Sequence, residues 1–332
     1  MTRIFSGIQP TGRKHLGNYI GAITQYVAGQ QRGDGLFCIV DLHAITVPYE
    51  PARLRESVLD TAAILLAAGL DPDRCIFFRQ SDVPEHTELT WLLSAVTGYG
   101  ELTRMTQFKD KSAGQRDLVS AGLFTYPMLM AADVLAYGAH EVPVGDDQRQ
   151  HVELMRDIAE RFNTRFGETL VVPEGRFPAV GARIMDLQDP RRKMSTTGGT
   201  PQGTVLVLDE PNTILKKVRS AVTDSGAEVR RDPDKPGVSN LIEILGAVRR
   251  AEPATVEVEF DGQGYGAFKT AVAEAVVEYL APVRERYQEL RADEAELDRV
   301  FAGGAEKARA IATETVADVR EAMGFERVRA GR

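Results

Sequence analysis

The chain has 332 residues, enough for about two domains with a substantial buried core. Its 43% hydrophobic and 27% charged residues are close to the averages of globular proteins, which argues against a disordered or fibrous chain. The net charge of −8 argues against a surface that is basic throughout, although a local basic face is compatible with it. We expect a cytoplasmic protein without membrane contact, because we find neither a membrane-spanning apolar run nor a signal peptide.

Short β-rich runs alternate with runs of helical periodicity in the first half of the chain. Strands are predicted near residues 3–8, 36–40, 75–79 and 140–144. Helices are predicted over residues 54–70, 87–100, 125–138 and 146–163, with Asp146 as the cap of the last one. This alternation predicts a mostly parallel sheet that is covered on both faces.

The strand signal ends after TVLVLD, residues 204–209. Helices are predicted over residues 212–223, 239–250, 267–290 and 305–325, separated by loops rich in Gly, Pro and Asp. A second, helical domain is therefore expected. The two cysteines, Cys38 and Cys75, lie in apolar runs without a partner at zinc spacing, so we expect buried thiols and no metal site.

The first strand is followed by PTGRKHLGNYIGA, residues 10–22, which fits a tight turn and a helix that begins near His15. Gly17 would let a base or a phosphate approach the backbone, and the free N–H groups of a helix start favour an anion. His15 and Asn18, one turn apart, could both donate hydrogen bonds to phosphate oxygens. A glycine-rich turn with a surface histidine would have the same residues, so this pattern alone leaves both interpretations open.

Two later loops combine basic residues with flexible ones. DPRRKMSTTGGTPQG, residues 189–203, could close over a polyphosphate, although a solvated linker has the same composition. QFKDKSAGQ, residues 107–115, carries Lys109 and Lys111 and could equally be a surface loop. The sequence contains no Walker-A loop, no dinucleotide-binding glycine fingerprint, no GxSxG and no HExxH, which argues against the commonest NTPases, dehydrogenases, hydrolases and zinc peptidases.

HLGN, residues 15–18, and KMSTT, residues 193–197, together resemble the paired HIGH and KMSKS signatures of class I aminoacyl-tRNA synthetases. Blocks such as FSGIQPTG, GELTRMTQFKDKSAG and VPVGDDQRQHVELMRDIAERFN narrow the resemblance to the bacterial tryptophanyl-tRNA synthetase family, from Ile4 to about Gly324. It implies an α/β fold with a Rossmann-like nucleotide-binding parallel sheet over residues 1–195, including a dimer-forming insertion. Residues 196–332 would form a C-terminal helical domain that binds the tRNA anticodon, with the C-terminal helix.

The resemblance implies a homodimeric enzyme that makes tryptophanyl-adenylate and pyrophosphate from L-tryptophan and Mg-ATP, and then transfers Trp to the 3′ end of tRNA(Trp). The substrate carboxylate itself attacks the α-phosphate, so the protein supplies position and charge. ATP with Mg²⁺ enters as a substrate, and no zinc, flavin or NAD is implied. A tyrosine-specific relative and a non-catalytic protein that binds Trp or nucleotide are the alternatives left open.

The residues of the family's ATP site can be carried over one by one. Asp147 would meet the ribose, and Lys111 and Lys193 would meet the leaving pyrophosphate. The catalytic set is His15, Asn18, Lys111, Lys193 and Ser195. The ATP-binding set is Gln9, Gly17, Asn18, Gly145, Asp147, Ile184, Lys193 and Met194.

For tryptophan, Asp133 would accept the indole N–H, while Tyr126 and Gln148 would hold the α-amino group. An acid in the run MLMAADVLAY is costly to bury without a partner, so Asp133 needs one. Plain core packing explains Met130 and the two valines equally well, and His43 could be a hydrogen-bonded core histidine. The full set is Phe5, Gly7, His43, Tyr126, Met130, Asp133, Val142, Val144 and Gln148.

One position departs from the family, which usually has a second lysine in the KMS loop where this chain has Thr196. A threonine hydroxyl brings no charge, so we expect Lys111, Lys193 and Arg192 to stabilise the leaving pyrophosphate. Candidate tRNA contacts lie in basic clusters, each of which could equally be a solvated helix face. They are Lys216, Lys217, Arg219, Arg230, Arg231, Arg249 and Arg250.

Overall fold

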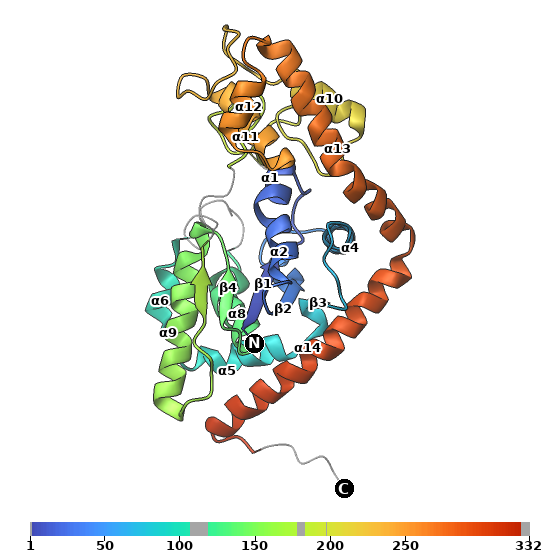
Figure 1. Cartoon of the computed structure of the whole chain (residues 1–332). Helices are drawn as coiled ribbons and strands as arrows, with labels where there is room; N and C mark the ends of the chain where they lie inside the picture. The colour runs from blue at the N-terminus through green and yellow to red at the C-terminus, as the bar shows by residue number, and fades with distance from the viewer. Residues whose placement is uncertain (1, 107–118, 178–182, 197, 327–332) are drawn as a thin grey trace.

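The computed structural model describes residues 2–106, 119–177, 183–196 and 198–326. Its five named strands form one parallel sheet in the order β3-β2-β1-β4-β5 (Figure 1). They are β1 (Arg3–Ile8), β2 (Asp34–Ile39), β3 (Ile76–Arg79), β4 (Glu141–Pro143) and β5 (Glu174–Arg176). The prediction of the first four is confirmed. The short edge strand β5 was missed, because its sequence, EGR, has no apolar alternation.

The helices predicted before residue 200 are found in the predicted order, but two helices replace the single one predicted over residues 87–100, and the short helix at 41–44 was not predicted. The helices of this part are α1 (Leu16–Asn18), α2 (Thr24–Gly29), α3 (Asp41–Ala44), α4 (Pro51–Ala67), α5 (Glu85–Ser94), α6 (Tyr99–Thr103), α8 (Ala121–Leu135) and α9 (Arg149–Phe166). The prediction that Asp146 caps α9 is wrong. Residues 146–148 form a separate 3-10 turn, so Gln148 occupies the cap position, and the Asp146 carboxylate pairs with Arg149 at 2.8 Å instead.

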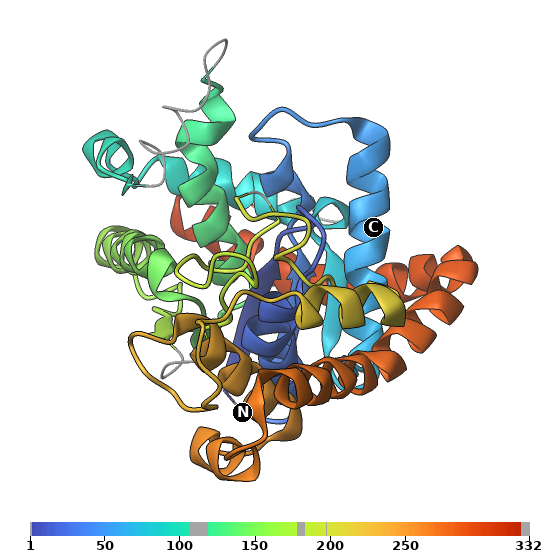
Figure 2. The ribbon, with the colours of Figure 1, turned by 90° about the horizontal axis from the view of Figure 1, so that it is seen from above.

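The C-terminal helices are α10 (Pro211–Arg219), α11 (Pro236–Arg249), α12 (Pro253–Glu259), α13 (Gly264–Ala292) and α14 (Glu294–Ala322). The short α12 was not predicted. Residues 204–209 form no named strand and pair only through a bridge between His15 and Leu206. Seen from above, helices α10 to α13 lie over the segment that carries β1 and α1 (Figure 2).

The sheet is buried on both faces, which explains the nearly continuous apolar run of β2. Phe37 and Ile39 pack in the core cluster that includes α4, whereas Leu36 and Cys38 pack in the cluster that includes α5, α8 and α9. The expectation of buried free thiols is confirmed for Cys38 and Cys75. In the described part of the chain, no helix has the length and apolarity needed to cross a bilayer.

The last helix, α14, leaves the helical part and runs back along the sheet (Figure 1). Gly304 packs so closely on β3 that a Cβ there would lie 1.8 Å from the backbone oxygen of Phe77. Ion pairs of Arg309 with Glu85 and of Arg320 with Glu88 join α14 to α5. Helix α14 is therefore part of the packing of the sheet.

The strand order places a topological switch between β1 and β4. From β1 the chain moves outward to β2 and β3, and β4 then pairs on the other side of β1. In such sheets the crevice for ligands lies beyond the carboxyl ends of the two strands at the switch. The segments after β1 and β4, which begin at Gln9 and Val144, are therefore the structural candidates for a binding site.

Candidate active site

His15 follows β1 and caps α1, the helix start that the sequence predicted. Its Nδ1 accepts the backbone N–H of Asn18 at 3.3 Å, and the Asn18 side-chain oxygen accepts the backbone N–H of His15 at 3.2 Å. Burial, followed by the charges of Lys193 and Lys14, lowers the pKa of His15 to about 4, so the ring is neutral at pH 7. Because Nδ1 is the acceptor, the ring proton is on Nε2, which can donate to a ligand.

The KMS loop folds against the turn that follows β1. Met194 donates its backbone N–H to the carbonyl of Ile184 at 3.1 Å, which holds the loop start next to a buried segment. A Cβ on Gly17 would lie 3.4 Å from the Cβ of Ile184, and a Cβ on Gly12 would lie 3.2 Å from Oγ1 of Thr196. The two predicted phosphate elements, separated by about 180 residues of sequence, therefore lie side by side.

The predicted ATP-site residues differ in exposure. Ile184 and Met194 are buried in the hydrophobic core, and Lys193 is exposed beside His15. Gln9, Gly145 and Asp147 are exposed, while Gly17, Asn18 and Ser195 are half-buried. Asp147 accepts a hydrogen bond from the side chain of Gln148 at 2.6 Å. Lys111 lies outside the described residues.

Sequence reasoning missed two residues that shape this site. Asp186 is 2% exposed, and its Oδ1 accepts the backbone N–H groups of Gln188 and Asp189, which fixes the turn that leads into the KMS loop. Lys14 donates to the carbonyl of Gln9 at 2.9 Å, and burial lowers the pKa of Lys14 to about 8. An acid within the run IMDL was the available signal for Asp186.

Asp133 has the partners that its buried position requires. It is 2% exposed, and its Oδ2 lies 2.7 Å from Nε2 of His43. Its Oδ1 lies 2.6 Å from the side-chain nitrogens of both Gln80 and His86, two residues that sequence reasoning also missed. Burial raises the pKa of Asp133, but His43 and His86 lower it by more, so that the carboxylate is ionised.

The other residues predicted for the tryptophan pocket lie mainly on α8 and on or next to the strands β1 and β4. Tyr126 and Met130 precede it by seven and three positions on α8 and so share its helix face. The Tyr126 hydroxyl lies 2.9 Å from Nε2 of His151, and burial raises the pKa of Tyr126 to about 12. Phe5 on β1 stacks on Tyr137, with ring centroids 5.6 Å apart. Val142 is buried, whereas Met130 and Val144 are half-buried and Gly7 is exposed.

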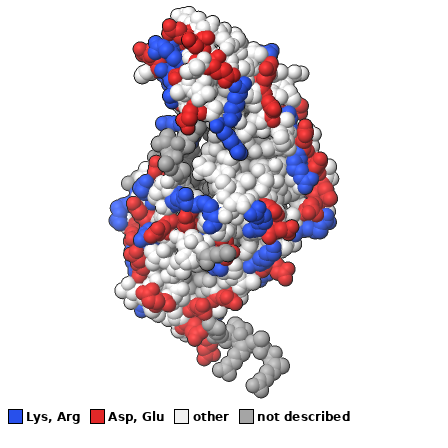
Figure 3. Space-filling model, viewed as in Figure 1, with Lys and Arg blue, Asp and Glu red and all other residues white. Residues whose placement is uncertain are grey.

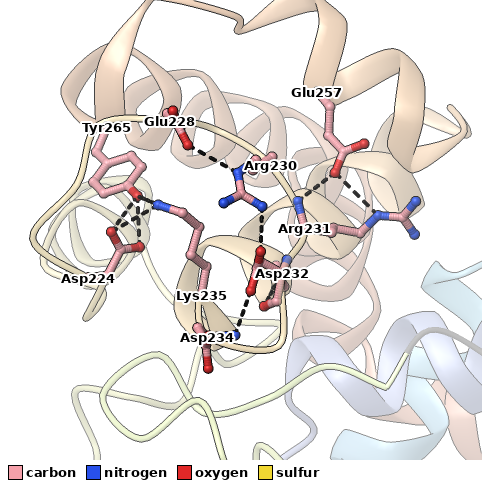
Figure 4. Close-up of polar contacts among 10 residues, drawn as sticks. Asp224, Glu228, Arg230, Arg231, Asp232, Asp234, Lys235, Glu257 and Tyr265 are labelled. Atoms are coloured by element: carbon pink, nitrogen blue, oxygen red, sulfur yellow. Dashed lines mark hydrogen bonds and ion pairs between the residues drawn. The ribbon is translucent and has the colours of Figure 1, made fainter.

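The basic clusters are largely neutralised by acids. The surface of Figure 3 interleaves Lys and Arg with Asp and Glu. Arg230 pairs with Glu228 and Asp232, and Arg231 pairs with Glu257 (Figure 4).

The prediction that Lys217 is an exposed residue available to contact tRNA is wrong. It is buried, and its Nζ contacts Asp209 at 2.7 Å and the carbonyl of Thr204 at 2.8 Å. Arg249 pairs with Glu259. Among the described residues, the predicted cluster members without an ion pair are Lys216, Arg219 and Arg250.

A parallel sheet with its switch point between β1 and β4, a neutral histidine donor after β1 and a lysine-bearing loop against it define a nucleotide-binding protein of the class I synthetase fold. The family model described as "tRNA synthetases class I (W and Y)" matches residues 1–281. The chain therefore belongs to the class I tRNA synthetases of the tryptophan and tyrosine group.

Individual relatives and structures agree with this assignment. The chain is 54% identical over 326 residues to "Tryptophan--tRNA ligase 2" of Streptomyces avermitilis, covering 97% of both chains. It is 50% identical to "Tryptophan--tRNA ligase" of Caldanaerobacter subterraneus, covering 98% of this chain and 99% of the relative. The structure of tryptophanyl-tRNA synthetase from Campylobacter jejuni complexed with ADP and tryptophan matches with a TM-score of 0.86 and 37% identity, covering 98% of this chain and 100% of the other.

Proposed function

We propose that this protein is a tryptophan–tRNA ligase, which activates L-tryptophan with Mg-ATP and transfers it to tRNA(Trp). The observation that carries this proposal is the ionised, buried carboxylate of Asp133 among the residues predicted to surround an indole ring. It lies in a chain that is half identical to ligases of that name along nearly its whole length.

In the proposed first step, a carboxylate oxygen of tryptophan attacks the α-phosphorus of ATP. The new bond joins this oxygen to phosphorus, and the bond from the α-phosphorus to pyrophosphate breaks. Pyrophosphate leaves with the electron pair, and Mg²⁺ accompanies the phosphates as part of the substrate. In the second step, a ribose hydroxyl of the terminal adenosine of tRNA attacks the tryptophanyl carbonyl, and AMP leaves.

We assign His15 as a neutral donor to a phosphate oxygen through Nε2, with Asn18 holding the ring by their reciprocal hydrogen bonds. Lys193 and Lys111 would stabilise the leaving pyrophosphate, with Ser195 as a further donor. Gly17, Ile184 and Met194 would bound the adenine, and Gln9, Gly145 and Asp147 would bind the phosphates and ribose. Such preorganised donors act on the charge that develops in the transition state.

In the tryptophan pocket, we assign Asp133 to the indole N–H, and Tyr126 and Gln148 to the α-amino group. Phe5, Gly7, His43, Met130, Val142 and Val144 would enclose the ring. The aromatic side chains and the face shared by Tyr126, Met130 and Asp133 on α8 support this assignment.

We also propose a homodimer, because Trp91 and Tyr99 are 77% and 75% exposed near one another in sequence on α5 and α6. Exposed large aromatic side chains are typical of protein interfaces. A second copy of the chain is the proposed occupant, and sedimentation of Trp91→Glu as a monomer would support it. The division into a catalytic part, residues 1–195, and an anticodon-binding part, residues 196–332, and the cytoplasmic location stay predictions.

ATP–pyrophosphate exchange with Trp, Tyr and Phe as separate substrates tests the proposed function. We expect exchange with Trp and little with Tyr or Phe. Exchange with Tyr alone would identify a tyrosine-activating enzyme, and tryptophan binding without exchange would identify a non-catalytic relative. Aminoacylation of tRNA(Trp) then tests the second step.

A further inference from the structure

Asp133 accepts three hydrogen bonds, and they are distributed unequally over its two oxygens. Oδ1 accepts from Gln80 Nε2 and faces His86 Nδ1, both at 2.6 Å. Oδ2 has one partner among the described residues, His43 Nε2 at 2.7 Å. Since a carboxylate oxygen accepts about two hydrogen bonds, Oδ1 is saturated and Oδ2 has room for one more donor.

Both partners of Oδ1 are themselves fixed. Gln80 accepts the backbone N–H of Leu42 through Oε1 at 3.0 Å, so that its amide nitrogen must point to Asp133. Burial raises the pKa of Tyr137, whose protonated hydroxyl lies 2.6 Å from His86 Nε2. If this hydroxyl donates to Nε2, the His86 proton is on Nδ1 and is directed at Oδ1. Gln80 and His86 are completely buried.

We propose that Gln80 and His86 are positioning residues that determine specificity for an aromatic ring bearing an N–H group. Their hydrogen bonds hold Oδ1 of Asp133 in place, which leaves Oδ2 of Asp133 to accept the N–H of the ring. Neither residue belongs to the set carried over from the family, and they reach Asp133 from different elements, the turn after β3 and the first turn of α5. This proposal rests on the proposed function, in which Asp133 contacts the indole.

The physical basis is that the two hydrogen bonds restrict rotation of the Asp133 carboxylate about its terminal bond. Two donors on one oxygen hold the plane of the Asp133 carboxylate before the substrate arrives, which lowers the entropy lost on binding. When a ring without an N–H binds, Oδ2 of Asp133 lacks a second hydrogen-bond donor in a buried site, and this disfavours binding. Discrimination between rings with and without an N–H should therefore decrease when the hydrogen bonds of Gln80 or His86 to Asp133 are removed.

The test compares tryptophan with β-(3-benzothienyl)alanine, in which sulfur replaces the indole N–H, by the ratio of their kcat/KM values in ATP–pyrophosphate exchange. His86→Leu removes the donor, and His86→Asn retains an amide nitrogen near the place of Nδ1. We expect His86→Leu to lower kcat/KM for tryptophan by about 10- to 100-fold, mainly through KM, with a much smaller loss for the analogue. His86→Asn should restore most of the ratio.

Gln80→Met is the second variant if His86→Leu does not fold, and it should reduce the ratio in the same direction. His140→Leu, an exposed histidine outside the pocket, is the matched control and should leave the ratio unchanged. If the variants lost kcat/KM equally for tryptophan and for the analogue, His86 and Gln80 would have only a structural role, and the inference would be overturned. If the wild type shows no Trp-dependent exchange, or Asp133→Asn leaves the ratio unchanged, the proposed function or its assignment of Asp133 fails instead.

Discussion

The imidazole of His15 and the side chain of Asn18 each accept the other residue's backbone N–H, at 3.3 and 3.2 Å. This reciprocal pair fixes both the start of α1 and the tautomer of the histidine ring. His15, the first residue of the HLGN element, is thus a helix cap and a proposed phosphate donor at the same time.

Substitutions of His15 separate these two roles. His15→Ala should lower the rate of adenylate formation by about 10²- to 10³-fold, the loss expected for one preorganised donor. His15→Asn should keep a good helix cap but lack a donor at the position of Nε2, so that stability is retained and the rate stays low. Exchange kinetics and urea unfolding measure the two effects, and a normal rate in His15→Asn would contradict the donor role.

The lowered pKa of His15 makes folding stability depend on pH. Below pH 6.5 the unfolded state binds a proton at this histidine, whereas the folded state binds it only near pH 4. Stability from this residue is therefore lost as the pH falls from 6.5 to 4. Unfolding by urea at pH 7 and pH 5 should show a larger loss for the wild type than for His15→Asn. If the wild type and His15→Asn lost the same free energy of unfolding, the His15 ring would be protonated in the folded state to the same extent as in the unfolded state.

Because Thr196 in the KMS loop is neutral, we expect the rate of adenylate formation to depend strongly on Lys111, which lies outside the described residues. We expect Lys111→Ala to slow adenylate formation by at least about 10-fold, because a charge that stabilises pyrophosphate is lost. Thr196→Lys should recover part of that rate in the double variant. Lys109→Ala is the control, and an unchanged rate in Lys111→Ala would refute compensation by this lysine.

Adjacent glycines of α14 offer a matched test of its packing on the sheet. Gly304→Ala should destabilise the protein by about 1–3 kcal/mol, because its Cβ would overlap the Phe77 carbonyl. Gly303→Ala has no heavy atom within 4 Å of its new Cβ and should stabilise the helix by up to about 1 kcal/mol. Denaturant midpoints of the two variants on either side of the wild type would confirm this packing; a stable Gly304→Ala would contradict it.

Lys216 and Lys217 are neighbours with different expected roles. Lys217→Met leaves Asp209 buried without its ion pair and should lower the free energy of unfolding by about 3–5 kcal/mol. Lys216→Glu, on the exposed side of α10, should leave stability unchanged and raise KM for tRNA without changing pyrophosphate exchange. Aminoacylation kinetics test this, and an unaffected KM in Lys216→Glu would exclude Lys216 as a tRNA contact.

The local parts of the fold followed from the sequence. The strands β1 to β4 and most of the long helices have periodicities and end signals that nearby residues set, and the start of α1 at HLGN was placed correctly. Helix α14 was predicted only from residue 305, whereas it begins at Glu294. Asp146 was misplaced because a capping signal does not distinguish a helix from a 3-10 turn before it. Strand β5 and helix α12 were missed because short elements depend on their neighbours rather than on their own pattern.

For the site, the sequence by itself determined which residue types stand near the strand ends: a histidine-glycine turn, a lysine-bearing loop and one acid in an apolar helix. Only the tertiary structure decided which of them meet. It brought Thr196 to Gly12, gave Asp133 the partners Gln80 and His86, and buried Lys217 against Asp209. The physical reason is that burial and pairing depend on contacts between segments far apart in the chain, and no local pattern contains them.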